Sequence, residues 1–108
     1  MELTNPTLPI QLPDLTEFCQ RWQVAELAVF GSILREDFNE TSDVDFLVTF
    51  IPKAPWGLFD HARMQQELEA QLNRKVDLVS RRAIERSQNW IRRQDILSTA
   101  QVIYVRES

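Results

Sequence analysis

The run from Phe30 to Val48 constrains the fold of this chain more than any other part of its sequence. It reads FGSILREDFNETSDVDFLV, so a Gly31-Ser32 pair ends one apolar segment and an Asp-x-Asp opens the next, ten residues later. Glycine commonly ends strands, and short apolar runs bounded by turn residues are typical of buried strands. The run therefore predicts two neighbouring strands, with a tight turn after the first and two carboxylates at the start of the second.

Asp43 and Asp45 project to the same side of such a strand, because successive side chains alternate between its two faces. Two adjacent carboxylates repel each other and are costly to desolvate unless a cation lies between them. Oxygen ligands suit Mg²⁺, which usually shares its coordination shell with substrate phosphates. Gly31 lets a ligand approach the backbone, and Ser32 begins a turn whose N–H groups can face phosphate oxygens. This segment predicts a site for a nucleotide and its metal ions.

A third acid lies in the short apolar segment from Lys75 to Ser80. Asp77 interrupts that strand pattern, which is an unusual position for an aspartate unless something satisfies its charge. If this strand lies beside the one that carries Asp43 and Asp45, the three carboxylates converge. A third carboxylate allows a second metal ion to be held, or a proton to be taken from an attacking hydroxyl.

Taken together, these motifs resemble the nucleotidyltransferase superfamily that includes DNA polymerase beta and kanamycin nucleotidyltransferase. The small size resembles its minimal branch, the MNT proteins, which are antitoxins encoded with HEPN ribonuclease toxins. The resemblance covers the segment from about Leu27 to Leu78 and extends plausibly over the whole chain. The sequence departs from the family at Ile33 and Glu36, where many relatives have arginine and glycine.

The resemblance implies a role for each motif residue. The nucleotide triphosphate would be bound by Gly31, Ser32 and Arg35. The catalytic and metal-binding residues would be Asp43, Asp45 and Asp77. The cofactor implied is Mg²⁺, with two ions, and the implied substrate is ATP.

A nucleotidyltransferase of this size has no second lobe to enclose an acceptor, so we expect another protein to present it. The resemblance implies AMP transfer from ATP to a tyrosine hydroxyl of a cognate HEPN toxin, in a stable hetero-oligomer that neutralises the toxin. Trp56, Phe59 and Trp90 are candidate interface residues. The alternatives are a non-catalytic binding antitoxin with a vestigial site, and a nucleotidyltransferase that acts on a small molecule or an RNA end.

Composition limits the other possibilities. The net charge of −4 argues against stable nucleic-acid binding, although arginines concentrate between positions 81 and 93. No apolar run is long enough to span a membrane, and the N-terminus lacks the pattern of a signal peptide. Cys19 is the only cysteine, so no intrachain disulfide forms, and we expect a cytoplasmic protein. His61 falls on a predicted helix, where a packed or surface position is expected.

We expect an extended lead-in over residues 1–12 and a single minimal nucleotidyltransferase domain over 13–108. The expected helices cover 13–22, 58–73 and, as one long final helix, 83–97; the expected strands cover 27–30, 43–50, 75–80 and 102–105. Strands that alternate with helices predict an α/β or α+β fold. The resemblance implies the polymerase beta-like nucleotidyltransferase fold, a small mixed sheet flanked by helices.

Overall fold

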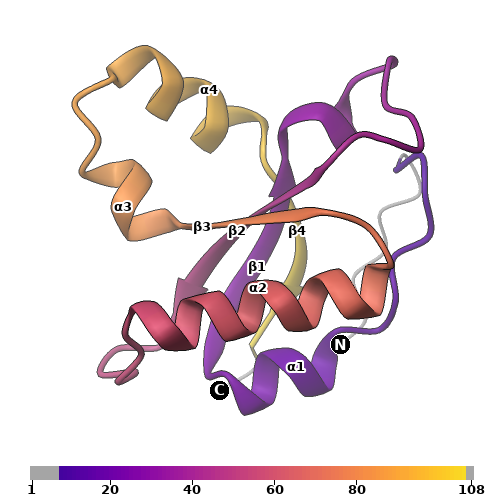
Figure 1. Ribbon diagram of the computed structural model, residues 1–108. Helices are drawn as coiled ribbons and strands as arrows, with labels where there is room; N and C mark the ends of the chain where they lie inside the picture. The colour runs from indigo at the N-terminus through magenta and orange to yellow at the C-terminus, as the bar shows by residue number, and fades with distance from the viewer. Residues whose placement is uncertain (1–7, 107–108) are drawn as a thin grey trace.

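The computed structural model describes residues 8–106 and has one mixed sheet with helices on both faces (Figure 1). In chain order its elements are α1 (Thr16–Arg21), β1 (Val24–Phe30), the 3₁₀ turn η1 (Gly31–Leu34), β2 (Val44–Phe50), α2 (Leu58–Leu72), β3 (Val76–Ser80), α3 (Arg81–Glu85), α4 (Trp90–Thr99) and β4 (Gln101–Val105). The predicted fold class is confirmed. None of the helices in this described part is long and apolar enough to cross a membrane.

The strand order is β3-β2-β1-β4. β1 pairs antiparallel with both β2 and β4, whereas β2 and β3 are parallel and are linked by α2 as a crossover helix. β1 begins at Val24, three residues before the predicted start at Leu27. The reason is local: Gln23 has a φ of 57°, so the chain turns sharply after α1 and enters the strand at once.

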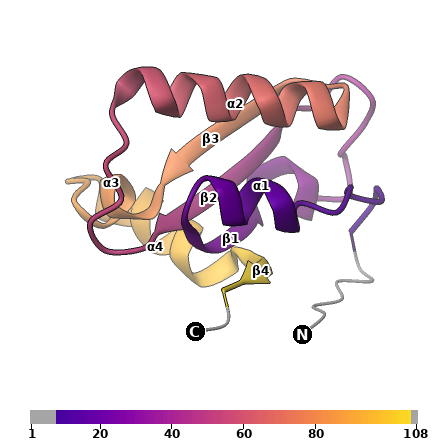
Figure 2. The same ribbon diagram turned by 90° about the horizontal axis from the view of Figure 1, so that it is seen from below.

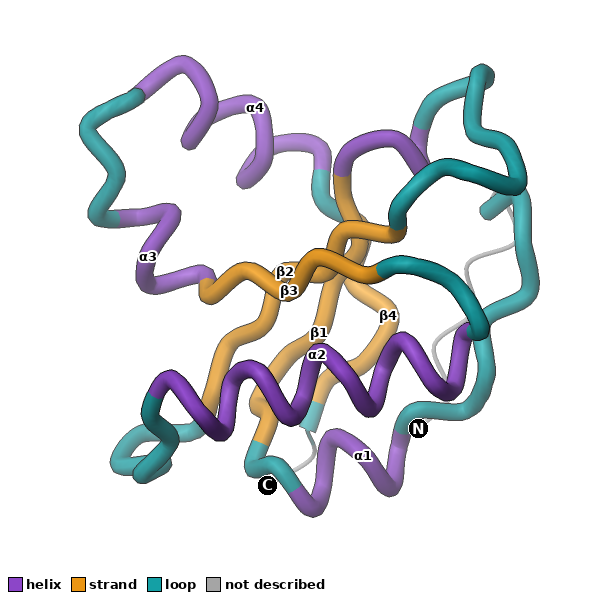
Figure 3. Tube along the Cα trace, viewed as in Figure 1, coloured by secondary structure: helices purple, strands orange, loops and turns teal. Residues whose placement is uncertain are grey.

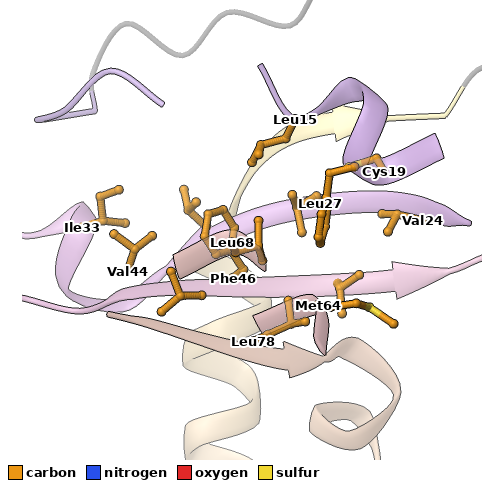
Figure 4. Packing of buried hydrophobic residues seen from close by; sticks show 14 residues of the cluster. Leu15, Cys19, Val24, Leu27, Ile33, Val44, Phe46, Met64, Leu68 and Leu78 are labelled. Atoms are coloured by element: carbon orange, nitrogen blue, oxygen red, sulfur yellow. The ribbon is translucent and has the colours of Figure 1, made fainter. Parts of the chain in front are cut away.

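The two faces of the sheet carry different cores, because alternate strand residues point to opposite sides. Helices α1 and α2 cover one face (Figure 2). Figure 4 shows the packing there, in which Phe46 from β2 meets Leu27 from β1 and Leu68 from α2. The buried residues of this cluster, the α1–α2 core, are Leu15, Phe18, Cys19, Val24, Leu27, Val29, Ile33, Val44, Phe46, Val48, Met64, Leu68, Val76 and Leu78.

Helices α3 and α4 lie on the opposite face, over a smaller apolar cluster. Its buried residues, the α3–α4 core, are Ala28, Phe30, Leu47, Ile84 and Ile96. β2 contributes Leu47 to this cluster, two positions after Asp45, so the carboxylate of Asp45 lies on the same face as α3 and α4.

The single long helix predicted over 83–97 is wrong. The chain instead forms α3 and α4, separated at residues 86–89. Local side chains explain the break, because the Asn89 side chain accepts a hydrogen bond from the Arg92 N–H (3.1 Å) and begins a new helix as its cap. The Ser87 hydroxyl accepts the Asn89 N–H (3.2 Å), so residues just before α4 bond to side chains rather than to a helical turn.

The segment before α1 has no helix or strand over residues 8–15. Leu8, Ile10 and Leu12 nevertheless pack against the α1–α2 core. The helix predicted from Pro13 begins at Thr16, where the Asp14 carboxylate accepts the Thr16 N–H (2.9 Å). Residues 1–7 of the predicted lead-in lie outside the described chain.

Candidate active site

Asp45 and Asp77 are direct neighbours across the β2–β3 ladder. The parallel register pairs Asp45 with Asp77 and Leu47 with Val79, so both carboxylates lie on the α3–α4 face. Asp43 precedes β2 by one residue. The predicted adjacency of the two acid-bearing strands is confirmed, and it places the three aspartates at the end of the sheet where β2 and β3 begin.

The Gly31-Ser32 turn lies against these acids. Gly31 has a φ of 77°, and a Cβ atom at this position would lie 2.3 Å from Oδ2 of Asp45. Only glycine therefore allows the turn and the Asp45 carboxylate to coexist as they are. The Ser32 hydroxyl donates a hydrogen bond to the backbone oxygen of Asp43 (3.0 Å), and the Ser32 backbone N–H lowers the pKa of the neighbouring Asp45 carboxyl. The turn thus contacts two of the three aspartates directly.

The electrostatics of the site are unbalanced. Asp45 is half-buried, whereas Asp43 and Asp77 are exposed. Burial raises the pKa of the Asp45 carboxyl, and the neighbouring charges of Asp77 and Asp43 raise it further, against the opposing effects of the Ser32 N–H and of Arg35. No lysine or arginine in residues 8–106 forms an ion pair with any of the three. Apart from the charge effect of Arg35, no cation among residues 8–106 balances the negative charge of the three aspartates.

The three carboxylates fit a hard divalent cation that takes most of its ligands from water and from substrate phosphates. All three donors are carboxylates, and a cation would relieve the repulsion that raises the pKa of Asp45. The part of the chain that the structure describes contains no three acidic, histidine or cysteine side chains already grouped closely enough to enclose an ion. The ion that suits this open arrangement is therefore one that retains water and phosphate oxygens, as Mg²⁺ does.

One of the two departures from the family pattern has a packing role. Ile33 is 1% exposed and belongs to the α1–α2 core, so position 33 has a packing role in this chain. Arg35 is exposed at the end of η1, and its charge opposes the rise in the Asp45 pKa, which places it on the side of the acids. Glu36 is exposed in the loop that follows.

Three side chains of α2, which sequence reasoning missed, hold the outer edge of β3 on either side of Asp77. His61 Nε2 donates to the backbone oxygen of Leu78 (2.6 Å), and Gln65 Oε1 accepts the Leu78 N–H (3.1 Å). Glu69 Oε2 accepts the Val76 N–H (3.1 Å). Their spacing by four places these side chains in one row on α2, but it does not identify the strand edge that they contact. His61 is therefore packed, as predicted, and is not at the site.

Trp56 is also away from the acids. Its ring packs edge-on against Trp22 with centroids 5.0 Å apart, and its Nε1 donates to the Trp22 backbone oxygen (2.7 Å). These contacts hold Trp56 half-buried against the α1–α2 core, so less of it is exposed than of Phe59 or Trp90, and its interface role stays a prediction. A surface hollow of about 420 Å³ between α1 and α2 is lined by Glu17, Arg21 and Glu67, among others, and by none of the predicted site residues.

Comparisons with known proteins identify the family of this chain. Residues 15–103 match the nucleotidyltransferase domain family. Protein adenylyltransferase MntA of Thermococcus cleftensis is 39% identical over 71 residues, which cover 64% of this chain and 68% of that protein.

Two solved structures share the fold. One, described as a minimal nucleotidyltransferase, is 33% identical with a TM-score of 0.61, over 84% of this chain and 85% of its own. The other is a toxin–antitoxin crystal structure with AMP-PNP, 18% identical with a TM-score of 0.66, over 86% of this chain and 72% of its own. At 18% identity that second likeness concerns the fold alone. The family match, the curated relative and the fold together assign this chain to the nucleotidyltransferase domain family of enzymes, as a member of its minimal (MNT) branch.

Proposed function

We propose that this protein is a magnesium-dependent protein adenylyltransferase and an antitoxin. It transfers AMP from ATP to a tyrosine hydroxyl of a cognate HEPN ribonuclease toxin, releases pyrophosphate, and thereby neutralises the toxin. The observation that carries the chemistry is the register of Asp45 against Asp77, beside a glycine turn whose missing Cβ leaves room for the Asp45 carboxylate. The acceptor class is supported by the relatives, which include a protein adenylyltransferase and toxin–antitoxin complexes.

Each site residue has a role in this proposal. Gly31, Ser32 and Arg35 bind the triphosphate through the turn backbone, the hydroxyl and the guanidinium, while Asp43 and Asp45 hold the metal. When bound, a pair of Mg²⁺ ions neutralises the triphosphate and lowers the pKa of the acceptor hydroxyl. Asp77 either contributes to holding the second ion or accepts the hydroxyl proton. The chain then needs only positioned acids and a phosphate-binding turn, because catalysis of this transfer is mainly positioning and charge neutralisation.

The partner surface in this proposal includes two exposed apolar pairs. Leu58 and Phe59 at the start of α2 are 89% and 88% exposed, and Trp90 and Ile91 at the start of α4 are 61% and 65% exposed. Large aromatic side chains in contact with water are typical anchors of protein interfaces. In Figure 1 the start of α2 lies at the lower left and the start of α4 at the upper left, and the two helices cover opposite faces of the sheet. Phe59 and Trp90 are thus the more exposed interface candidates, and Trp56, which is half-buried, is the less exposed one.

Co-expression with the protein encoded beside this gene tests the proposal. A neighbour with the Arg-x4-His motif of HEPN ribonucleases is the expected partner. With the wild type, intact-mass spectra of that partner should show one or more added AMP units, and cell growth should recover. A double variant with Asp43→Asn and Asp45→Asn should still bind the partner and leave its mass unchanged, as should EDTA treatment of the wild type in vitro.

Other outcomes assign other functions. Rescue of growth by the double variant, with no mass added by the wild type, would make the protein a non-catalytic binding antitoxin. Failure to bind the neighbour at all would favour a small-molecule or RNA acceptor. Ile33, one of the two departures from the family pattern, is buried in the α1–α2 core, so packing accounts for the residue at this position.

A further inference from the structure

Asp43 is the last residue of the loop between η1 and β2, residues 35–43, and it does not belong to the ladder of paired strand residues. The register of β2 with β3 begins at Val44, so Asp43 itself is outside it. Asp43 is also exposed, which means that no core packing fixes its position. Besides the Ser32 hydroxyl, which donates to the backbone oxygen of Asp43 (3.0 Å), another group must hold the last residues of this loop if Asp43 is to act at a defined place.

Arg74, in the connection from α2 to β3, makes the contacts that do so. Its Nη1 donates to the backbone oxygen of Ser42 (2.9 Å) and to that of Asn39 (3.2 Å). Its guanidinium lies over the Phe38 ring, with Cζ 4.7 Å from the ring centroid. The Arg74 side chain therefore contacts the loop at three residues, and one of them, Ser42, directly precedes Asp43. Figure 3 shows this loop and the α2–β3 connection on the same side of the molecule.

The loop is built to receive this contact. Asn39 Oδ1 accepts the Thr41 N–H (2.9 Å), and Ser42 Oγ accepts the Asn39 N–H (3.0 Å), so residues 39–42 form a compact turn. That turn directs the oxygens of Asn39 and Ser42 toward Arg74. On the far side of Asp43, the Val44 N–H donates to Lys75 O (3.1 Å), next to Arg74 in the chain.

We propose that Arg74 is a positioning residue for Asp43. Its guanidinium links the Asp43 loop to the start of β3, the strand that carries Asp77, and so sets the relative position of two of the three acids. Its effect on nucleotidyl transfer rests on the proposed function; its effect on loop order and on divalent-ion binding does not. Arginine suits this task better than lysine, because a planar guanidinium stacks on an aromatic ring while it donates to two carbonyl oxygens.

The test compares Arg74→Gln with Arg21→Gln. Arg21 is a matched control, because its guanidinium also makes two hydrogen bonds, both to Glu67 (2.9 and 2.5 Å), but between α1 and α2 on the opposite face. Three quantities are measured for each variant: amide hydrogen exchange of residues 39–44, Mn²⁺ binding by electron paramagnetic resonance with AMP-PNP present, and kcat and KM for ATP.

For Arg74→Gln, exchange of residues 39–44 should accelerate and Mn²⁺ affinity should fall by about 10-fold to 100-fold, as for other residues that orient a metal ligand. The kcat should fall by a similar factor, with a smaller change in the KM for ATP. Arg74→Lys should recover part of the loss, since an ammonium group can still donate to the two carbonyl oxygens. Arg21→Gln should leave all three quantities at their wild-type values.

An Arg74→Gln variant that melts earlier but keeps wild-type Mn²⁺ affinity and kcat would overturn the proposal and leave Arg74 a purely structural role. Wild-type Mn²⁺ binding that is insensitive to Asp43→Asn would also overturn it. A wild type that binds Mn²⁺ through Asp43, loses that binding on Arg74→Gln, and transfers no nucleotide would instead sink the proposed function and leave this inference intact.

Discussion

The two faces of the sheet are made from the same strands, yet one face carries most of the apolar core and the other carries the acidic site. Among the described residues, fourteen are buried on the face toward α1 and α2 and five on the face toward α3 and α4, where Asp45 is half-buried and Asp77 is exposed. Along β2 the division runs residue by residue, with Phe46 in the large core and Asp45 beside it on the other face. Stability is thus concentrated on one face, which allows the other to keep repelling carboxylates that cost stability.

Truncation of one core residue on each face should give the largest change in the free energy of unfolding. The difference between the two variants measures how unequally the two faces contribute to stability. Leu68→Ala, at a fully buried position of α2, should lower the free energy of unfolding by about 2–5 kcal/mol. Ile96→Ala, in the five-residue cluster, should cost less, because a thin cluster near the surface can close more of the cavity. Urea unfolding of both variants checks this, and an equal or larger cost for Ile96→Ala would break the comparison.

Gly31→Ala should damage the acidic face while the α1–α2 core stays intact. The added Cβ would overlap Oδ2 of Asp45, and the φ of 77° disfavours alanine. The carboxylate must move, and a displacement of about 1 Å in a catalytic group can lower the rate of transfer by roughly 100-fold. Transfer of AMP and the melting temperature should be measured together. Normal transfer with a normal melting temperature would show that the turn tolerates a side chain and that the Asp45 position is not critical.

The acidic face also shows what the sequence predicts well. Gly31, Asp43, Asp45 and Asp77 were found because each is chemically out of place in an apolar strand or at its end, and that signal is local. The parallel pairing that sets Asp45 opposite Asp77 needed the family resemblance, since strand order depends on contacts between residues far apart in sequence.

Features that depend on one side chain meeting a distant backbone were not predicted. The Arg74 contacts to the Asp43 loop span more than thirty residues, and the contacts of His61, Gln65 and Glu69 link a helix to a strand edge. Periodicity describes which face of an element is apolar and does not describe such polar contacts. The break between α3 and α4 has a local cause that the sequence does contain. Apolar residues continue at helical spacing on both sides of Asn89, and this pattern favoured one long helix over the capping signal of Asn89.

Asp45→Asn should stabilise the protein in the absence of metal. This change in stability should be smaller than the loss expected for Leu68→Ala, and opposite in sign. The pKa of Asp45 is raised above 3.8 in the folded state, so the folded protein binds this proton more tightly than the unfolded chain. The ionised carboxylate therefore costs stability at neutral pH, and this cost disappears as the pH falls through the raised pKa toward 3.8.

Thermal unfolding from pH 7 to pH 3 measures this difference. The variant should melt a few degrees above the wild type at pH 7 and together with it near pH 3, and it should lose the stabilisation that Mg²⁺ with AMP-PNP gives the wild type. A lower melting temperature for Asp45→Asn at neutral pH would mean that Asp45 supports the fold, and the contrast between the two faces would then fail.

The smallest effect is expected at the Arg21–Glu67 pair, on the surface of the stable face. Arg21 lowers the pKa of the Glu67 carboxyl below 4.5, and the Trp22 indole N–H also donates to it (3.0 Å). The contribution of Glu67 to stability is therefore present above pH 4.5 and lost as the pH falls through its lowered pKa. Because the pair is open to solvent, Glu67→Gln should lower the melting temperature at pH 7 by only about 2 °C or less, and the difference should shrink in high salt and below pH 4. A larger, salt-insensitive loss would show that α1 is held to α2 chiefly by this pair, and that the stable face owes less to its apolar core than the burial of Phe18 and Leu68 indicates.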